Sequence, residues 1–152
     1  MKSKEYDIII VGAGPAGLTL AEKLASENFK ILLLDKKKNA QDLQYDTAGS
    51  FINPKEWGLP KDILNPISKC HIISKNKEII KEGKGVIINK GGLLRFLEKK
   101  ARKNKNLELC YGAIIKNIYF NKKILGIEYL RVKKFLGRLQ KFMWIVRDLV
   151  LY

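Results

Sequence analysis

The stretch that decides the fold is Tyr6–Asp35, which reads YDIIIVGAGPAGLTLAEKLASENFKILLLD. The run Ile8–Val11 is short, β-branched and continuous, which is typical of a buried parallel strand. Apolar side chains recur at helical spacing through Leu18–Glu27, and Ile31–Leu34 is a second apolar run. The stretch therefore predicts a strand, a helix and a second strand, with glycines spaced G-x-G-x-x-G at the first turn.

The three glycines of this turn each have a physical role. Gly12 permits the tight turn off the strand, Gly14 lets a pyrophosphate approach the backbone, and Gly17 lets helix and sheet pack closely. A helix start favours phosphate because free N–H groups and the helix dipole meet there. Pro15 suits this first turn because it gives up an N–H that has no helical partner. The candidate pyrophosphate-binding residues are Gly12, Ala13, Gly14, Pro15, Ala16 and Gly17.

An acidic residue completes the pattern. Asp35 ends the second strand 18 residues after Gly17, where a carboxylate can accept both hydroxyls of an adenosine ribose and repel a 2′-phosphate. Lys36 follows it and is a further candidate contact. Glycines between a strand and a helix, with an acid after the next strand, are much more specific than glycines alone. The alternative is an ordinary glycine-rich turn without a ligand.

Composition limits the class of protein. With 152 residues and 46% hydrophobic side chains, the chain is globular and large enough for one core. Thirty Lys and Arg against 15 Asp and Glu give a net charge of +15, which attracts nucleic acid, anionic lipid or an acidic partner. We favour a solvated lysine-rich surface and no nucleic acid, because the lysines are spread along the chain without interleaved stacking aromatics.

Residues for metal or acid–base chemistry are scarce. Cys70 and Cys110 are far apart and form no C-x-x-C pair, and there is one histidine, so no metal site is expected. That histidine, His71, lies in an apolar run, and no side chain is nominated as catalytic. The first apolar run breaks at Gly12, too early for a signal peptide or a spanning helix. We therefore expect a cytoplasmic location, with membrane association as a further expectation.

The rest of the chain predicts short strands and one more helix. Residues 36–45 are expected to be loop, and residues 46–66 form either a ligand-facing loop or a surface excursion anchored by Trp57. Predicted in order are a hairpin (Ile67–Ile73 with Glu78–Ile80), a strand (Val86–Ile88), a turn (Asn89–Gly92), a helix (Leu93–Arg102), a strand joining the nucleotide sheet (Leu107–Tyr111) and a strand pair (Ala113–Tyr119 with Ile124–Tyr129).

Taken together, these motifs resemble the geranylgeranyl reductase-like branch of the FAD-dependent oxidoreductases, which are related to the aromatic-ring hydroxylases. The first matching segment is Asp7–Leu18, which closes at Asp35. The second is Asn89–Ala101, and the third is Leu107–Ile118, followed by Gly126–Glu128. The resemblance covers residues 5 to 130, and its first segment is the specific one.

The resemblance implies an α/β fold, namely a Rossmann-like FAD/NAD(P)-binding domain with added β-hairpins, incomplete at its C-terminus. FAD would rest its pyrophosphate on the glycine loop and its ribose on Asp35. Lys90 stands where the family has an arginine, and it keeps the charge without the planar bidentate fork. By family, the flavin transfers hydride to an isoprenoid or other apolar small molecule. The implied electron donor is NAD(P)H or ferredoxin.

The C-terminal residues depart from the family, so we divide the chain into a partial FAD-binding domain (1–132) and a tail (133–152). The tail has an apolar stripe opposite Lys and Arg, which predicts a basic amphipathic helix that binds a membrane surface or a partner. A helix that covers the sheet is the plainer alternative.

A shifted reading frame is a third interpretation of the tail. Two bases along, the codons of Phe142–Ile145 must give Tyr or His, then Val, then Asp, resembling the family's missing flavin motif.

Three other functions remain open beside the reductase. They are a fragment of an FAD-dependent monooxygenase, a non-catalytic dinucleotide-binding module with a docking tail, and an NAD-binding domain. Because a strand that helps to enclose the flavin is missing, we expect weak FAD binding and little turnover by this polypeptide alone.

Overall fold

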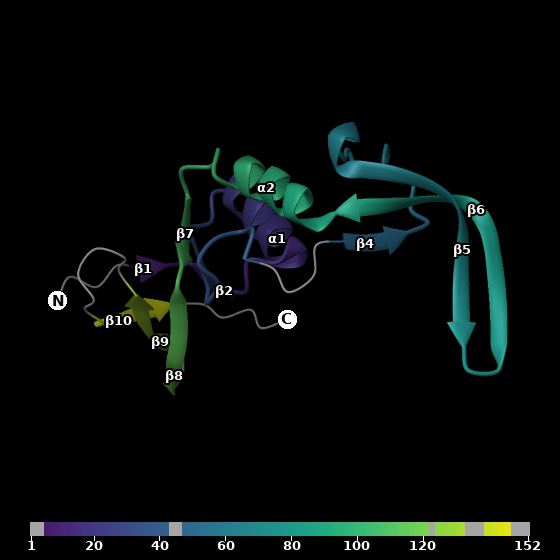
Figure 1. Ribbon diagram of the computed structural model, residues 1–152. Coiled ribbons are helices and arrows are strands. Elements are labelled where there is room, and N and C mark those ends of the chain that lie inside the picture. The colour runs from purple at the N-terminus through teal and green to yellow at the C-terminus, as the bar shows by residue number, and fades with distance from the viewer. Residues whose placement is uncertain (1–4, 43–46, 122–123, 133–138, 147–152) are drawn as a thin grey trace. The chain divides into compact units, whose positions relative to one another are not determined.

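The protein folds as two compact units. The computed structural model describes residues 5–42, 47–121, 124–132 and 139–146 (Figure 1). The first unit consists of residues 1–42 and 96–152, and the second of residues 43–95. The boundary expected at residue 132 falls inside the first unit, directly after a strand.

A parallel sheet forms the centre of the first unit. Its strands are β2 (Ile8–Val11), β3 (Ile31–Asp35) and β7 (Leu107–Tyr111), in the order β2-β3-β7. All five residues of the middle strand β3 are buried, as the continuous apolar run predicts for a strand covered on both faces. The prediction that residues 107–111 join this sheet is confirmed by their parallel pairing with β3.

Helices cover one face of the parallel sheet. Helix α1 (Pro15–Ser26) buries Leu18, Ala21 and Ala25. Helix α2 (Lys90–Ala101) begins in the second unit and ends in the first. Its last turns lie beside α1, because the Nζ of Lys100 is 3.5 Å from a carboxylate oxygen of Glu22.

A second sheet covers the other face. It contains β1 (Glu5–Tyr6), β8 (Ala113–Asn121), β9 (Ile124–Val132) and β10 (Leu139–Val146), in the order β1-β10-β9-β8. A core cluster joins the two sheets; its members are Tyr6, Leu32, Leu34, Cys110 and Ala113. The first unit is therefore a helix layer, a parallel sheet and a mostly antiparallel sheet.

One expectation for the tail is wrong where the structure describes it. Residues 139–146 form strand β10 rather than an amphipathic helix, pairing antiparallel with β9 and parallel with β1. The segment reads LQKFMWIV, and its aromatic and β-branched residues favour a strand. The remaining residues of the predicted helix, 133–138 and 147–152, lie outside the described residues.

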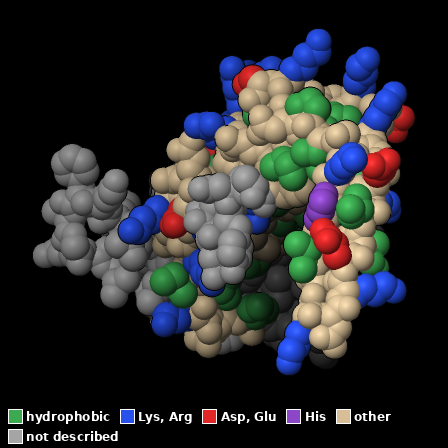
Figure 2. All heavy atoms as spheres, turned by 45° about the vertical axis from the view of Figure 1, so that its right-hand side comes forward, with side chains coloured by type: hydrophobic (Ala, Val, Ile, Leu, Met, Phe, Trp, Pro, Cys, Tyr) green, Lys and Arg blue, Asp and Glu red, His purple; other side chains and the backbone are tan. Residues whose placement is uncertain are grey.

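The second unit is built on a long hairpin. Strand β4 (Thr47–Ser50), helix η1 (Lys61–Ile63), β5 (Leu64–Ser74) and β6 (Lys77–Asn89) follow in the chain, and the strand order is β4-β6-β5. The hairpin prediction is confirmed, although both strands are longer than expected and the segment 86–88 is the end of β6. Figure 2 shows the single histidine on the surface, beside hydrophobic side chains.

Three local predictions in this unit need correction. Residues 47–50, expected as loop, form β4 because they pair with β6. Trp57 is not a packing anchor, since 68% of it is exposed. The turn predicted at Asn89–Gly92 is the start of α2, where Oδ1 of Asn89 accepts the N–H of Gly92 at 2.8 Å as an N-cap. No helix among the residues described is long and apolar enough to cross a membrane.

Candidate dinucleotide-binding site

The glycine loop lies at the corner between β2 and α1, as the sequence predicts. Gly12 has φ of +106°, a conformation that side chains rarely adopt. Its N–H donates to the carbonyl oxygen of Leu34 at 2.7 Å, which ties the loop to the neighbouring strand β3. The fold itself therefore requires glycine at position 12.

Gly17 is also required by the fold. A Cβ at this position would lie 1.9 Å from the carbonyl oxygen of Gly12 and 3.1 Å from its carbonyl carbon. Both atoms belong to the backbone, so they cannot move aside as a flexible side chain would. This glycine permits the close approach of α1 to the end of β2.

Gly14 differs from its two neighbours. Its backbone is extended, with φ of −81° and ψ of −176°, which any residue adopts. A Cβ built there would meet nothing within 4 Å. Neither backbone strain nor packing within the protein explains a glycine at position 14, and the space beside it is open to a ligand.

The start of α1 is electropositive. No side chain caps it, its first turn contains no acidic residue, and Pro15 is at the first helical position. The N–H groups of a first turn have no acceptors within the helix, and the helix dipole adds partial positive charge. Pro15 and Ala16 are exposed, so this end of the helix is accessible to an anion.

Asp35 lies at the carboxyl end of β3, beside the glycine loop, and only 6% of it is exposed. Its Oδ2 accepts the N–H of Ala13 at 2.6 Å, and its Oδ1 accepts the N–H of Lys37 at 2.8 Å. Sequence reasoning missed both bonds, which join the glycine loop to the loop after β3. Each carboxylate oxygen has two lone pairs, so Asp35 retains acceptor capacity beyond these two bonds.

The two lysines of the predicted site lie in different units. Lys36 is exposed directly after Asp35 in the first unit. Lys90 is the first residue of α2 and belongs to the second unit. Its contact with a bound cofactor stays a prediction.

A polar cluster at the end of β7 was not predicted. Tyr111 pairs in register with Asp35, and its hydroxyl donates to Oε2 of Glu98 at 3.2 Å. The other oxygen of Glu98 accepts from Nε of Arg102 at 2.6 Å. Burial raises the pKa of Tyr111 above its ordinary value, and the charge of Glu98 raises it further, so the phenol stays protonated. Tyr111 is the last residue of the parallel strand β7. Because ligands bind at the carboxyl ends of parallel strands, this position was the signal from which the cluster could have been predicted.

A depression of about 680 Å³ lies at the opposite edge of the parallel sheet. Glu5, Tyr6, Lys30 and residues 105–108 line it, at the start of strands β3 and β7 rather than their ends. Nucleotides bind outside the carboxyl ends of parallel strands, so this depression is not the candidate site. The glycine loop is instead an open corner of the first unit.

Sequence comparisons identify the glycine-loop segment. Residues 10–40 match the family model of the NAD(P)-binding Rossmann-like domain. A curated protein from Methanosarcina barkeri, described as an uncharacterized protein in the nifH2 5′ region, is 54% identical over 33 residues. These residues make up 22% of this chain and 18% of that protein.

Solved structures match almost the whole chain. p-Nitrophenol 4-monooxygenase from Pseudomonas putida gives a TM-score of 0.72 at 16% identity, over 97% of this chain and 40% of that chain. A geranylgeranyl bacteriochlorophyll reductase-like protein from Thermoplasma acidophilum gives 0.71 at 17% identity, over 97% and 38%. The flavin-dependent monooxygenase PieE, in complex with FAD and substrate, gives 0.68 at 13% identity, over 97% and 30%.

These comparisons establish the fold. The chain has the Rossmann-like dinucleotide-binding fold that flavoprotein oxidoreductases share. It spans about two fifths or less of the length of these solved structures, and less than a fifth of the curated relative.

Proposed function

We propose that the first unit binds FAD and that this chain supplies the cofactor-binding part of a flavin-dependent oxidoreductase. The observation that carries the proposal is Gly14, a glycine that the protein's own backbone and packing do not require. A pyrophosphate approaching the loop gives that position a reason to lack a side chain. The flavoprotein neighbours favour FAD over other dinucleotides, since one of them is described in complex with FAD.

The residues of the loop fit a diphosphate. The backbone N–H groups at the start of α1 would hold its oxygens, with Pro15 and Ala16 leaving the approach open. Asp35 would accept the adenosine ribose hydroxyls while it keeps its bonds to Ala13 and Lys37. Lys36 and Lys90 are further proposed contacts. Bound FAD would supply redox chemistry at its isoalloxazine ring, and this chain's part is to bind and orient it.

The substrate and electron donor follow from the resemblance. The geranylgeranyl reductase-like neighbour supports an apolar, isoprenoid-type substrate, and NAD(P)H or ferredoxin is the proposed electron donor. Contact with a membrane surface belongs to the same proposal, because such a substrate resides in membranes. The two monooxygenase neighbours favour a second candidate, in which the same cofactor unit serves a flavin-dependent monooxygenase.

Titration calorimetry of the full chain with FAD, NAD, ADP and 2′,5′-ADP tests which cofactor it binds. We expect FAD to bind more tightly than NAD, and ADP more tightly than 2′,5′-ADP, because the Asp35 carboxylate repels a 2′-phosphate.

A single added methyl group tests the loop. Gly14→Ala is expected to weaken FAD binding about tenfold or more, equivalent to about 1.4 kcal/mol, while the urea midpoint stays unchanged because the new Cβ has open space. Thr19→Ala, at an exposed position further along α1, is the matched control and leaves binding unchanged. Equal binding by Gly14→Ala and the wild type would contradict the proposed site, and tighter binding of NAD would assign an NAD-binding domain.

A further inference from the structure

The β5–β6 hairpin extends as a two-stranded ribbon of exposed isoleucines. We call residues 69–82 the arm; it lies beyond the register shift between Ile67 and Lys69. Its four isoleucines, Ile72, Ile73, Ile79 and Ile80, are 54%, 74%, 49% and 52% exposed. Ile72 and Ile79 pair across the strands, and their chain neighbours Ile73 and Ile80 point to the opposite face. Both faces of the arm therefore present apolar surface.

The backbone edges of the arm are also open. Strand β4 pairs with β6 only at Val86–Asn89. Within the described ranges, no strand pairs with the outer edge of β5, or with the edge of residues 77–85 of β6 that faces away from β5. Long apolar edge strands readily accept another strand, and a lone two-stranded hairpin is marginally stable. A strand added to the open edge of β6 would pair with residues 77–85, on the same side of β6 as β4.

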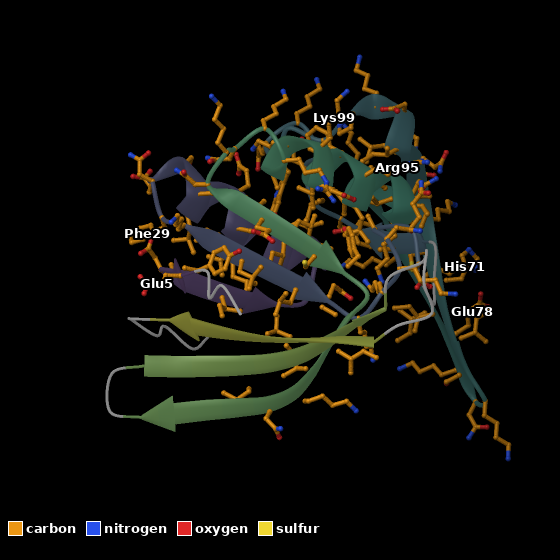
Figure 3. All side chains as sticks on the ribbon, turned by 90° about the vertical axis from the view of Figure 1, so that its left-hand side faces the viewer. Glu5, Phe29, His71, Glu78, Arg95 and Lys99 are labelled. Atoms are coloured by element: carbon orange, nitrogen blue, oxygen red, sulfur yellow. The ribbon has the colours of Figure 1, made fainter. Side chains whose placement is uncertain are left out.

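The charge of the arm is unbalanced. Both of its glutamates already have partners: Oε1 of Glu82 is 3.0 Å from Nζ of Lys69, and Oε1 of Glu78 is 2.7 Å from Nδ1 of His71 (Figure 3). The arm carries four lysines against these two glutamates. The surface around the isoleucines is therefore basic.

We propose that the arm is a docking surface for a β-strand of a partner polypeptide, and that this strand is acidic and β-branched. Main-chain hydrogen bonds along the open edge would give affinity, and alternate side chains would cover the isoleucines. A lipid surface fits less well, because hydrocarbon cannot satisfy open backbone groups. A second copy fits less well too, since the chain carries a net charge of +15 and would bring lysines against lysines.

Fluorescence anisotropy of the full chain with short labelled peptides tests the proposal. The probe alternates Glu with Val and Ile; one comparison peptide has Lys in place of Glu, and another has N-methyl groups along one backbone edge. We expect the acidic peptide to bind, and the other two to bind at least about tenfold more weakly, because one loses charge complementarity and the other loses its edge hydrogen bonds.

Variants assign the binding to the arm. Ile73→Asp with Ile80→Asp is expected to weaken binding of the acidic peptide about tenfold or more, because it removes apolar area that the strand would bury. Ile118→Asp is the matched control: Ile118 lies on β8 and is 60% exposed, so its replacement leaves binding unchanged. Circular dichroism checks that all three proteins have the same strand content.

Other occupants are tested in parallel. Sedimentation with phosphatidylserine–phosphatidylcholine vesicles and analytical ultracentrifugation of the chain alone complete the set. Vesicle binding that Ile73→Asp with Ile80→Asp abolishes, or self-association that it abolishes, would overturn the proposal in favour of lipid or of a second copy. Absence of binding by the acidic peptide would overturn it outright. None of these readouts depends on FAD.

Discussion

Two strand regions of this protein both contain adjacent aliphatic residues, and their surroundings are opposite. Strand β3 reads ILLLD and is buried at every residue. The arm reads CHIIS and KEIIK around its isoleucines, which are 49–74% exposed. The difference is coverage: helices and a second sheet lie on the two faces of β3, and no described element of the second unit covers the isoleucines. An apolar run predicts a strand, but its burial depends on what packs against it.

Among the single changes considered in the first unit, Gly17→Ala is expected to have the largest effect on stability. The new Cβ would lie 1.9 Å from the Gly12 carbonyl oxygen, so α1 must move away from β2. Overpacking costs typically about 1–3 kcal/mol and occasionally more. We expect a cost above that range, up to complete loss of the folded state, because the obstacle is backbone. Urea denaturation followed by circular dichroism measures it. A Gly17→Ala midpoint equal to that of Gly14→Ala would show that the loop is not closely packed.

Leu33→Ala compared with Ile73→Ala measures the contrast in coverage directly. Leu33 is fully buried in β3, and replacing such a leucine costs about 2–5 kcal/mol through lost transfer free energy and the cavity. Ile73 is 74% exposed, so its replacement should change the free energy of unfolding by about 0.5 kcal/mol or less. Chemical denaturation of both variants gives the two values. A comparable cost at both positions would mean that the arm is covered in solution.

The sequence was sufficient for the parallel sheet and the glycine loop, because both depend on local signals. The continuous run Ile31–Leu34 and the spacing of Gly12, Gly14 and Gly17 lie close together in the chain, and each part agrees with its neighbours. The bonds of Asp35 to the N–H groups of Ala13 and Lys37 were not predictable, since they depend on how two loops meet in space.

Errors arose where tertiary pairing decides the local structure. Residues 47–50 are small and turn-prone, yet pairing with β6 makes them a strand. Residues 139–146 place apolar side chains at helical spacing, yet they lie between β1 and β9 as a strand. Trp57 was the expected anchor in one of the two interpretations of residues 46–66, but the position of a loop side chain is set by surroundings that the sequence does not specify.

Tyr111→Phe tests how much a partly buried polar contact stabilises the first unit. At neutral pH the variant loses the bond to Glu98, at a cost of about 1 kcal/mol. Because the pKa of Tyr111 is raised in the folded state above its ordinary value of 10.0, the folded protein holds this proton more tightly than the unfolded chain. Its stabilising contribution is complete below about pH 10 and falls as the pH rises beyond it. Unfolding free energies of the two proteins should therefore converge above pH 10; a constant difference across that range would contradict the cause assigned to the shift.

Glu82→Gln on the arm should have the smallest effect, because its partner is as exposed as itself. The side chains of Lys69 and Glu82 are 59% and 68% exposed, and ion pairs in such surroundings contribute about 0–1 kcal/mol, which salt screens further. We expect a loss below about 0.5 kcal/mol in low salt that disappears in high salt, measured by urea unfolding at both ionic strengths. Asp62→Asn, which removes an exposed negative charge in η1, controls for the change in net charge. A larger, salt-independent loss at Glu82 would mean that water is excluded from this pair, and water is excluded only if another chain or segment already lies against the arm. The exposed Lys69–Glu82 ion pair is therefore also a sensitive reporter of whether the arm is covered.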